Sequence, residues 1–368
     1  MAYQTTTVPT DVLSGFVADI FTAAGCEPAE GARIAHHLLS ANLTGHDSHG
    51  VIRTPRYILW LREGKVKAGQ TISVVHETPT QAILDGNYGF GQTIGPLAVD
   101  FGIAKARQAG MAAIGLRNSG HIGRIGDWAE RAAEAGLISI HFVNVQAGEL
   151  VAPFGGVDRR FSTNPICIGV PTDKGPIILD FATSLVAEGK VLVASNGGKP
   201  VPPGSLIGPS GELSADPRML YGTIENTHVR DSARGEGALR TFGEHKGSGL
   251  AFMCELLAGC LTGGGTSGPI PGGKRGRIAN GMLSIYLAPG SFGTSGFSDS
   301  VLDYARYVKA SRPAETGGEV LIPGEPESRT RQERLKHGIP LQVETWAAIC
   351  DTAHALGLSP PAIPAPNA

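Results

Sequence analysis

Two histidines, a serine and an arginine lie close together in the segment GHDSHGVIR at 45–53. A histidine titrates near neutral pH, so His49 suits proton transfer to or from a substrate oxygen. The guanidinium fork of Arg53 matches a carboxylate. Together these residue types favour a 2-oxo or 2-hydroxy acid substrate. Two other interpretations stay open: His46 and His49 are spaced like two metal ligands, although no third follows at a typical distance, or these are structural polar residues around a helix break.

An acidic residue, Asp180, directly follows the apolar residues Ile177 to Leu179 in the segment IILDFATS. A carboxylate in such a position is often desolvated and needs a partner. Asp180 could orient an imidazole and stabilise its charged form. The alternative is that it caps the segment that follows.

Two glycine-rich loops lead into expected helices. The segment NSGHIGRIG at 118–126 contains Arg124, and the segment FGEHKGSG at 242–249 contains His245. Free N–H groups at a helix N-terminus can bind a phosphate, and a basic side chain adds charge. Bare turns are the alternative for both. The segment LIPGEPE at 321–327 is, by composition, only a turn before a charged helix.

The glycines Gly263, Gly265 and Gly268 formally match GxGxxG. A dinucleotide fingerprint must follow a strand and open a helix. Here the glycines follow a helix and lead into a loop, so we interpret them as a linker. Without a standard Rossmann signature, any nucleotide must bind in another way.

Composition narrows the class of protein. The 368 residues have 41% hydrophobic content and a formal net charge of −2, with 31 basic and 33 acidic side chains. A chain of this kind can bury a sizeable core, and no basic run favours nucleic acid or a membrane surface. We see neither a signal peptide nor a membrane span. Five cysteines without a CxxC pair fit reduced thiols in a cytoplasmic enzyme.

Helical and strand patterns alternate along the chain. A helix begins near Thr10 and turns Leu13, Phe16, Val17, Ile20 and Phe21 inward, and a second follows Pro28. Further strands are expected at 82–84, 111–116, 137–145, 167–171, 176–182 and 281–289, and helices at 96–109, 127–135, 247–262, 298–311 and 344–356. This is a mixed α/β (α+β) chain. We expect a discontinuous helical domain from 1–78 with about 312–368, and an α/β cofactor and substrate domain from 79–311.

Six motifs stand in one order over roughly residues 10–357: GHDSHGVIRTPRYILWLREG, NSGHIGRIGDWAE, VAPFGG with RFSTNPICIGVP, ILDFATS, FGEHKGSGLA, and IPGEPE with GIPL at 338–341. This order resembles the malate/L-lactate/ureidoglycolate dehydrogenase family. That is the type-2 family, unrelated to the Rossmann-type lactate and malate dehydrogenases. Within this family, the residues of the motifs are most similar to those of the hydroxycarboxylate dehydrogenase branch.

The resemblance implies an oxidoreductase that moves hydride between a nicotinamide cofactor and a 2-oxo acid. It implies a non-Rossmann NAD(P)-binding fold and a homodimer. The cofactor is NAD or NADP, with NADH favoured, and we expect no metal, nucleic-acid or membrane partner.

The resemblance also implies roles for individual residues. His49 resembles the proton donor and acceptor, with Ser48 beside it, Arg53 near the substrate carboxylate, and Asp180 as the partner of the histidine. The implied cofactor residues are His49, Gly123, Arg124, Ile125, Ile178, Leu179, Asp180, Phe181, Ala182, His245, Asn280, Gly324, Glu325, Pro326 and Glu327. His121 stands where the family loop usually has a histidine.

Some alternatives stay open. On the same fold, a cyclic imine could replace the oxo acid as substrate, and a metal-dependent hydrolase using His46, His49 and a carboxylate is a remote alternative. The sequence does not determine the substrate side chain, the physiological direction or the choice between NADH and NADPH. Arg124, Arg159 and Arg160 could each meet the 2′-phosphate that distinguishes NADPH. The stretch 223–237 is longer than expected, which suggests a flap or a dimer contact.

Overall fold

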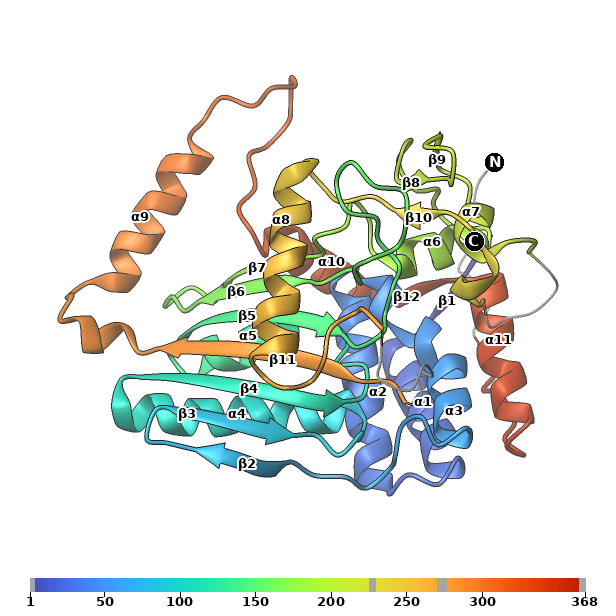
Figure 1. Cartoon of the computed structure of the whole chain (residues 1–368), viewed down its shortest axis with the longest axis horizontal. Coiled ribbons are helices and arrows are strands. Elements are labelled where there is room, and N and C mark those ends of the chain that lie inside the picture. The colour runs from blue at the N-terminus through green and yellow to red at the C-terminus, as the bar shows by residue number, and fades with distance from the viewer. Residues whose placement is uncertain (1–3, 225–229, 270–276, 364–368) are drawn as a thin grey trace.

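A seven-stranded sheet forms the centre of the protein (Figure 1). The computed structural model describes residues 4–224, 230–269 and 277–363. From edge to edge the strands are β2 (Ser73–Glu77), β3 (Gln81–Asp85), β4 (Met111–Ser119), β11 (Asn280–Leu287), β5 (Ile138–Val145), β6 (Ile166–Val170) and β7 (Ile177–Phe181). Strands β3 and β4 are parallel, and every other neighbouring pair is antiparallel.

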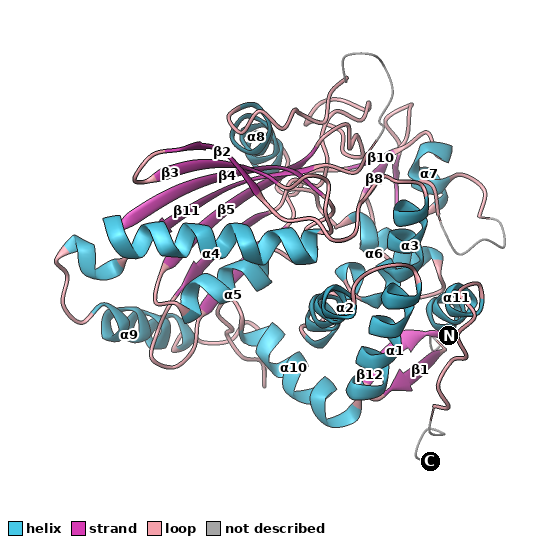
Figure 2. Ribbon diagram, turned by 90° about the horizontal axis from the view of Figure 1, so that it is seen from below, coloured by secondary structure: helices cyan, strands magenta, loops and turns pink. Residues whose placement is uncertain are grey.

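Helices cover both faces of this sheet (Figure 2). On one face lie α4 (Gly91–Ala109) and α5 (Gly126–Glu134), and on the other α8 (His245–Cys254), which continues into a π-helical segment, Glu255–Cys260. The first face buries Trp128 and Tyr286 in an apolar core. Because a Cβ at Gly102 would lie 2.2 Å from the Tyr286 ring, α4 can pack this closely only with glycine there.

The two ends of the chain meet in a helical layer beside the sheet. Its elements are α1 (Thr10–Ala23), α2 (Pro28–Leu43), α3 (Thr54–Arg62), α11 (Val343–His354), and the antiparallel pair β1 (Thr5–Val8) and β12 (Ile339–Gln342). All the helices of this layer contribute to one apolar core. The five residues of α1 predicted to point inward are buried.

A third group of short elements packs on α6 (Glu188–Ser195) around its own apolar core. It contains α7 (Arg218–Tyr221) and a small antiparallel sheet of β8 (Leu206–Ile207), β9 (Leu213–Ser214) and β10 (Ala238–Leu239). The sequence predicts only long loops here. Part of the stretch 223–237 lies outside the described residues. Two further helices follow β11: α9 (Phe297–Lys309), which stands away from the body in Figure 1, and α10 (Glu325–His337).

Two features of the fold differ from the sequence prediction. Strands β1, β2 and β12 are not predicted, because two of them are held by a pairing between opposite ends of the chain and β2 is exposed along its length. Helix α4 begins at Gly91, before Pro96. A proline removes one helical hydrogen bond, but the buried face of α4 against the sheet maintains the helix.

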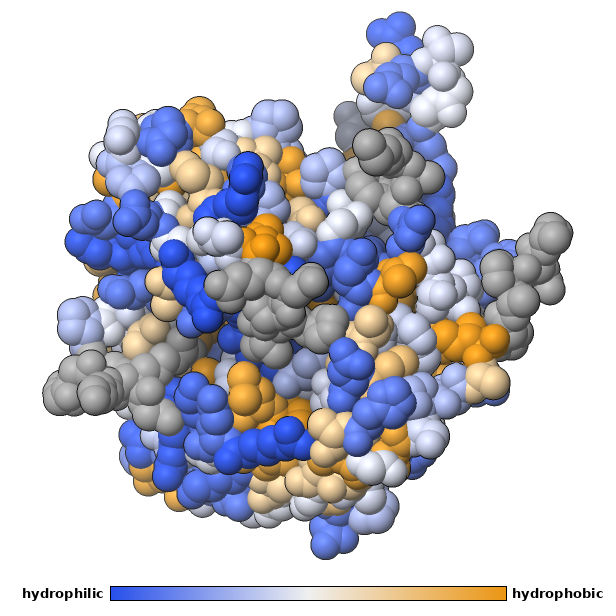
Figure 3. Space-filling view, turned by 90° about the vertical axis from the view of Figure 1, so that its right-hand side faces the viewer, coloured by the Kyte–Doolittle hydropathy of each residue, from blue (hydrophilic) through white to orange (hydrophobic). Residues whose placement is uncertain are grey.

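The surface is mixed in character. On the face that carries α3 and α11, apolar residues are scattered among hydrophilic ones (Figure 3). Within the described ranges, none of the helices combines the length and apolarity needed to cross a membrane. All five cysteines are free thiols.

Candidate active site

A tight turn after α2 positions the GHDSHGVIR residues. The Asn42 side chain organises it, since its amide nitrogen donates to Asp47 Oδ1 at 2.6 Å and its oxygen accepts from the Val51 N–H at 2.8 Å. A Cβ at Gly50 would lie 2.2 Å from that same oxygen. The turn consists of two 3₁₀ segments, Asp47–His49 and Val51–Arg53, and leads directly into α3.

His49 lies at the centre of the polar cluster that this turn creates. Its Nδ1 is 2.9 Å from Ser48 Oγ, and its ring stacks on that of His121 with centroids 5.6 Å apart. His121 Nδ1 is in turn 2.5 Å from the hydroxyl of Tyr57, which also accepts from Gln92 Nε2 at 3.2 Å. The histidine pair is therefore held from both sides by hydroxyl groups.

Both imidazoles of this pair are neutral near neutral pH. Burial lowers the pKa of His49 well below its ordinary 6.5, and His121 and Arg53 lower it further. Burial also lowers the pKa of His121 to about 3, again with a contribution from Arg53. In the free protein His49 is thus a proton acceptor, and it becomes a donor only when another group raises its pKa.

Arg53 is anchored beside His49. Its Nε donates to the carbonyl of Ser48 at 2.7 Å, and its Nη2 pairs with Glu188 Oε2 at 2.9 Å. Tyr221 donates to the other oxygen of Glu188 at 2.6 Å. Although burial disfavours both charges, Glu188 raises the pKa of Arg53, and Arg53 lowers that of Glu188. The buried pair is ionised, and Arg53 Nη1 has no hydrogen-bond partner among the described residues.

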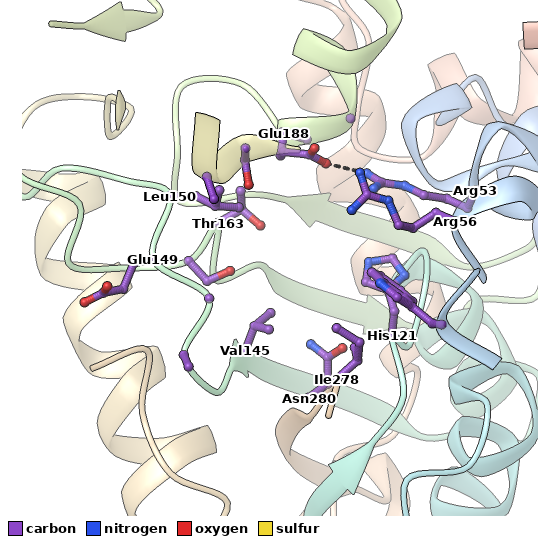
Figure 4. Close-up of a pocket in the computed structure, with 18 of the residues that line it drawn as sticks. Arg53, Arg56, His121, Val145, Glu149, Leu150, Thr163, Glu188, Ile278 and Asn280 are labelled. Atoms are coloured by element: carbon purple, nitrogen blue, oxygen red, sulfur yellow. Dashed lines mark hydrogen bonds and ion pairs between the residues drawn. The ribbon is translucent and has the colours of Figure 1, made fainter. Parts of the chain in front are cut away.

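A cavity of about 490 Å³ opens on one side of His49. Arg53, Arg56, His121 and Glu188 line one end of it, and Asn280 lies beside Ile278 below the two arginines in Figure 4. Asn280 donates to the carbonyl of Asn144 at 2.9 Å, while its own buried Oδ1 has no partner in the described part of the chain. This volume suits a small polar ligand.

A second cavity, of about 390 Å³, lies on the other side of His49. Its wall includes most of the predicted cofactor residues that precede α5 and end β7: Gly123, Arg124, Ile125, Asp180, Phe181 and Ala182. His49, Thr163 and Ala187 line both cavities. The imidazole therefore stands where the two cavities meet.

The strand β7 contributes only its last residues to the second cavity. Ile178 packs in the apolar core and Leu179 is 38% exposed, and neither lines the cavity. Asp180 does not hydrogen-bond His49. Its Oδ2 accepts from the Gly126 N–H at 2.7 Å, so it caps the N-terminus of α5. The predicted contact with His49 is therefore wrong, and the helix that Asp180 caps precedes it in the chain, whereas the sequence alternative placed the cap on the segment that follows. The hydrogen-bond partner of His49 is Ser48.

Arg124 is part of a buried ion-pair network. Its two Nη atoms donate to Asp127 at 2.8 Å and Glu130 at 2.7 Å. Asp127 also accepts from Ser40 and lies 2.8 Å from Nδ1 of His37, so the network connects α2 to α5. The Nε of Arg124 is buried without a partner among the described residues. Arg124 thus fixes the 123–125 loop, and its Nε is the nitrogen that makes no hydrogen bond there.

The segment 324–327, at the start of α10, lines neither cavity and meets the second one only through His46. Gly324 adopts a φ of +90° and packs against the backbone of Ile178, where a Cβ would lie 3.3 Å from the nitrogen. Pro326 lies in the first turn of α10, and Glu325 pairs with Lys309 of α9. Glu327 lies 3.4 Å from Nε2 of His46, which lines the second cavity.

His245, a predicted cofactor residue, lies away from both cavities. It is the first residue of α8, is exposed and lines neither cavity, and its ring contacts Phe154 with centroids 6.1 Å apart.

The two histidines that are spaced like metal ligands, His46 and His49, have separate partners. Within the described ranges no three His, Cys, Asp or Glu side chains gather as a metal site.

The sequence gives little sign of several residues that complete the site. Tyr57, Glu188 and Tyr221 stand in no pattern that predicts a role for them, yet they hold His121 and Arg53. A weak signal exists for Tyr57, because it lies one helical turn after Arg53. Gly189 is a second signal: a Cβ there would lie 2.4 Å from the Ser48 side chain, so glycine is needed where α6 meets the turn.

Comparison with known proteins identifies the class. A family model described as malate/L-lactate dehydrogenase matches residues 8–350. The chain belongs to this family, as the six motifs predict, and is a dehydrogenase.

Individual relatives agree with this assignment. The chain is 42% identical over 348 residues to hydroxycarboxylate dehydrogenase B of Escherichia coli strain K12, covering 94% of this chain and 93% of that protein. A solved Escherichia coli structure assigned to malate/lactate dehydrogenase matches 96% of both chains with a TM-score of 0.87 and 41% identity. Δ1-piperideine-2-carboxylate reductase from Pseudomonas syringae pvar. tomato matches 95% of this chain and 100% of that chain, with a TM-score of 0.79 and 30% identity. The predicted mixed α/β fold is that of these structures.

Proposed function

We propose that this protein is an NAD(P)-dependent 2-hydroxycarboxylate dehydrogenase in which His49 donates and accepts the proton. The observation that carries the proposal is the position of His49 between two cavities. One cavity has an anchored guanidinium, and the other is lined by the loop at 123–125 and the end of β7. A nicotinamide cofactor, when bound, supplies the hydride for the carbonyl carbon of the 2-oxo acid or accepts it from the 2-hydroxy acid.

The second cavity fits such a cofactor in the chemistry of its wall. Gly123 has a φ of +70°, and a Cβ there would lie 3.1 Å from Gln92 Nε2, so the backbone at this point stays open. The unpartnered Nε of Arg124 supplies a buried donor. Gly123, Arg124, Ile125 and the residues 180–182 would hold the cofactor there.

The side chains of the site divide the remaining work. Arg53 holds the substrate carboxylate through its open Nη1 and thereby fixes the reacting carbon. Ser48 fixes the orientation and tautomer of His49. In oxidation, neutral His49 accepts the hydroxyl proton; in reduction, protonated His49 gives that proton to the carbonyl oxygen. A carboxylate on Arg53 offsets one of the charges that depress the pKa of His49, so substrate binding favours protonation.

Other parts of the proposal concern cofactor choice and organisation. NADH is favoured, because the three arginines that could meet a 2′-phosphate already bind other groups. Arg124 binds the carboxylates of the ion-pair network, Arg159 binds three backbone carbonyls, and Arg160 binds Asp158.

The mostly antiparallel sheet supports a non-Rossmann cofactor site, since a doubly wound sheet is mostly parallel. The pairing of β1 with β12 supports a discontinuous domain of 1–78 with about 312–368 beside 79–311. A cytoplasmic location stays a prediction.

A homodimer is the third part of the proposal. Helix α9 and strands β6 and β7 enclose a cavity of about 460 Å³ with an almost wholly apolar lining, including Val170, Ile177 and Val301. Tyr304, from the same helix, is 68% exposed. A protruding helix with an apolar surface is typical of a protein interface.

A second candidate function is reduction of a cyclic imine. The neutral state of His49 favours it, because a protonated imine accepts hydride without a proton from the protein. A test that separates the two follows absorbance of NADH or NADPH with a panel of 2-oxo acids and of cyclic imines. Decay with an oxo acid supports the proposal. A fall in NADH or NADPH absorbance only with an imine shows that the site reduces C–N bonds. No fall in absorbance despite cofactor binding contradicts both candidate functions for the substrates tested.

A further inference from the structure

The cavity that holds Arg53 has more basic than acidic side chains. Its charged lining residues are Arg53, Arg56, Lys65, Arg159, Arg277, Glu149, Glu188 and Asp231. The histidines of the wall are neutral near neutral pH. With five basic and three acidic groups, the cavity attracts more than one negative charge.

Three of the five basic groups already have partners in the described structure. Arg53 pairs with Glu188, Lys65 pairs with Glu63 at 2.8 Å, and Arg159 donates to the carbonyls of Ser232, Gly235 and Gly237. Arg277 is exposed and lies over the ring of Tyr88 at 4.5 Å.

Arg56 is the remaining one, and its surroundings are unusual. It is half-buried, and in the described ranges it has neither a hydrogen bond nor an ion pair. Its guanidinium lies over the ring of Trp60 at 5.9 Å, which holds it in place without neutralising it. Burial lowers the pKa of Arg56, and the nearby Glu188 only partly opposes this. A half-buried cation that its neighbours compensate only in part gains stability when an anion binds it.

We propose that Arg56 is a specificity-determining residue that binds a second carboxylate, at the far end of the substrate. The preferred substrates are then short-chain 2-oxo dicarboxylates. This inference rests on the proposed function, in which Arg53 binds the carboxylate next to the reacting carbon.

The positions of the Arg53 and Arg56 guanidinium groups suit them to different carboxylates of one substrate. Arg53 is fixed beside His49 by Ser48 and Glu188. Arg56 lies three residues further along the helical chain and points into the same cavity next to Arg53 (Figure 4). Residues three positions apart are neighbours on one side of a helix, so the two guanidinium groups reach the same cavity and can bind the two ends of one substrate.

The test compares two substrates of equal chain length, 2-oxoglutarate and 2-oxopentanoate, which differ in the terminal carboxylate. Wild type should prefer 2-oxoglutarate. Arg56→Gln should lower kcat/KM for 2-oxoglutarate by about 10- to 100-fold, mainly through KM, because a hydrogen bond to a charged group is lost. It should change kcat/KM for 2-oxopentanoate by less than about threefold, within the effect of a surface substitution. Arg56→Lys should recover part of the preference.

The control is Arg107→Gln, which removes one positive charge from the exposed face of α4 and should alter neither value. An equal loss for both substrates in Arg56→Gln, or a wild-type preference for 2-oxopentanoate, would overturn the assignment.

If no oxo acid is reduced although NADH binds, the proposed function fails, and the role of Arg56 needs a test that does not depend on turnover. Calorimetry with glutarate then decides the role of Arg56. Binding to wild type that Arg56→Gln abolishes supports the role, and equal binding, or no binding to either, contradicts it.

Discussion

His49 is a buried histidine whose protonation depends on what binds beside it. Burial, His121 and Arg53 all lower its pKa. Ser48 is its hydrogen-bond partner, whereas Asp180 binds the backbone of Gly126. The proton chemistry of the site is therefore set by desolvation and by positive charge, with no carboxylate bonded to the imidazole among the described residues.

The lowered pKa of His49 predicts the pH dependence of 2-hydroxy acid oxidation. The neutral imidazole is the active form, and it persists as pH falls until the lowered pKa is reached. The acid limb of kcat/KM, which reports the free enzyme, should therefore have its midpoint below 6.5. Steady-state rates at constant ionic strength check this, and a limb at or above 6.5 that disappears in His49→Gln would contradict it.

Asp180 offers a direct test of its capping role. Asp180→Ala leaves the Gly126 N–H without its acceptor, so unfolding free energy should fall by about 1 kcal/mol and the KM for NADH should rise. Asp180→Asn retains an acceptor oxygen and should stay close to wild type in both. If Asp180 instead stabilised the charged imidazole, Asn would reduce kcat as strongly as Ala. Thermal unfolding, cofactor titration and kcat of the two variants distinguish these roles.

At the scale of elements, the turn between α2 and α3 determines whether a site exists. It carries Ser48, His49 and Arg53, and Asn42 holds it together through bonds to Asp47 and Val51. Arg334 of α10 binds Asp47 Oδ2 at 3.0 Å from the opposite end of the chain. The turn is thus supported by both terminal segments.

Gly50→Ala should disrupt this turn, because the new methyl group would lie 2.2 Å from Asn42 Oδ1. We expect a loss of about 1–3 kcal/mol in unfolding free energy and a loss of most turnover. Gly15→Ala is the matched control: its methyl group meets nothing within 4 Å, and a helical glycine replaced by alanine should gain about 0.5–1 kcal/mol. Chemical denaturation measures both, and a neutral Gly50→Ala would contradict the account of the turn.

Local patterns in the sequence predict the elements that depend on local interactions. The inward face of α1 and the strands β5 and β7 follow from apolar spacing. The pairing of β1 with β12 does not, because each strand is too short to be recognised without its distant partner. The same holds within the site. His49 and Arg53 are adjacent in sequence and predictable, while Glu188 reaches Arg53 only through the fold.

For the molecule as a whole, two cavities with different chemistry meet at one imidazole. The cavity with Arg53 lies toward α3 and the short elements around α6, and the other lies between the 123–125 loop and the end of β7. Under the proposed function, the first cavity would hold the anionic substrate and the second the reacting end of the cofactor, with both next to His49. Helix α9 lies outside it.

The protruding α9 predicts the oligomeric state. If α9 contacts a second copy of the chain, Tyr304→Glu places a charge in an apolar contact and should shift the protein from dimer to monomer. Leu213→Glu, at another exposed apolar position on β9, should leave the dimer intact. Light scattering after size-exclusion chromatography measures the mass. A monomeric wild type, or a dimeric Tyr304→Glu, would contradict this use of α9.

The most direct test of the account compares wild type with His49→Gln in NADH oxidation by 2-oxo acids, with NADH binding measured separately by fluorescence. We expect wild type to oxidise NADH with at least one 2-oxo acid. His49→Gln should lower kcat by about 10²–10⁴-fold, the usual contribution of a general acid, while still binding NADH. A variant that turns over at the wild-type rate would show that His49 is not the proton donor and acceptor of this dehydrogenase.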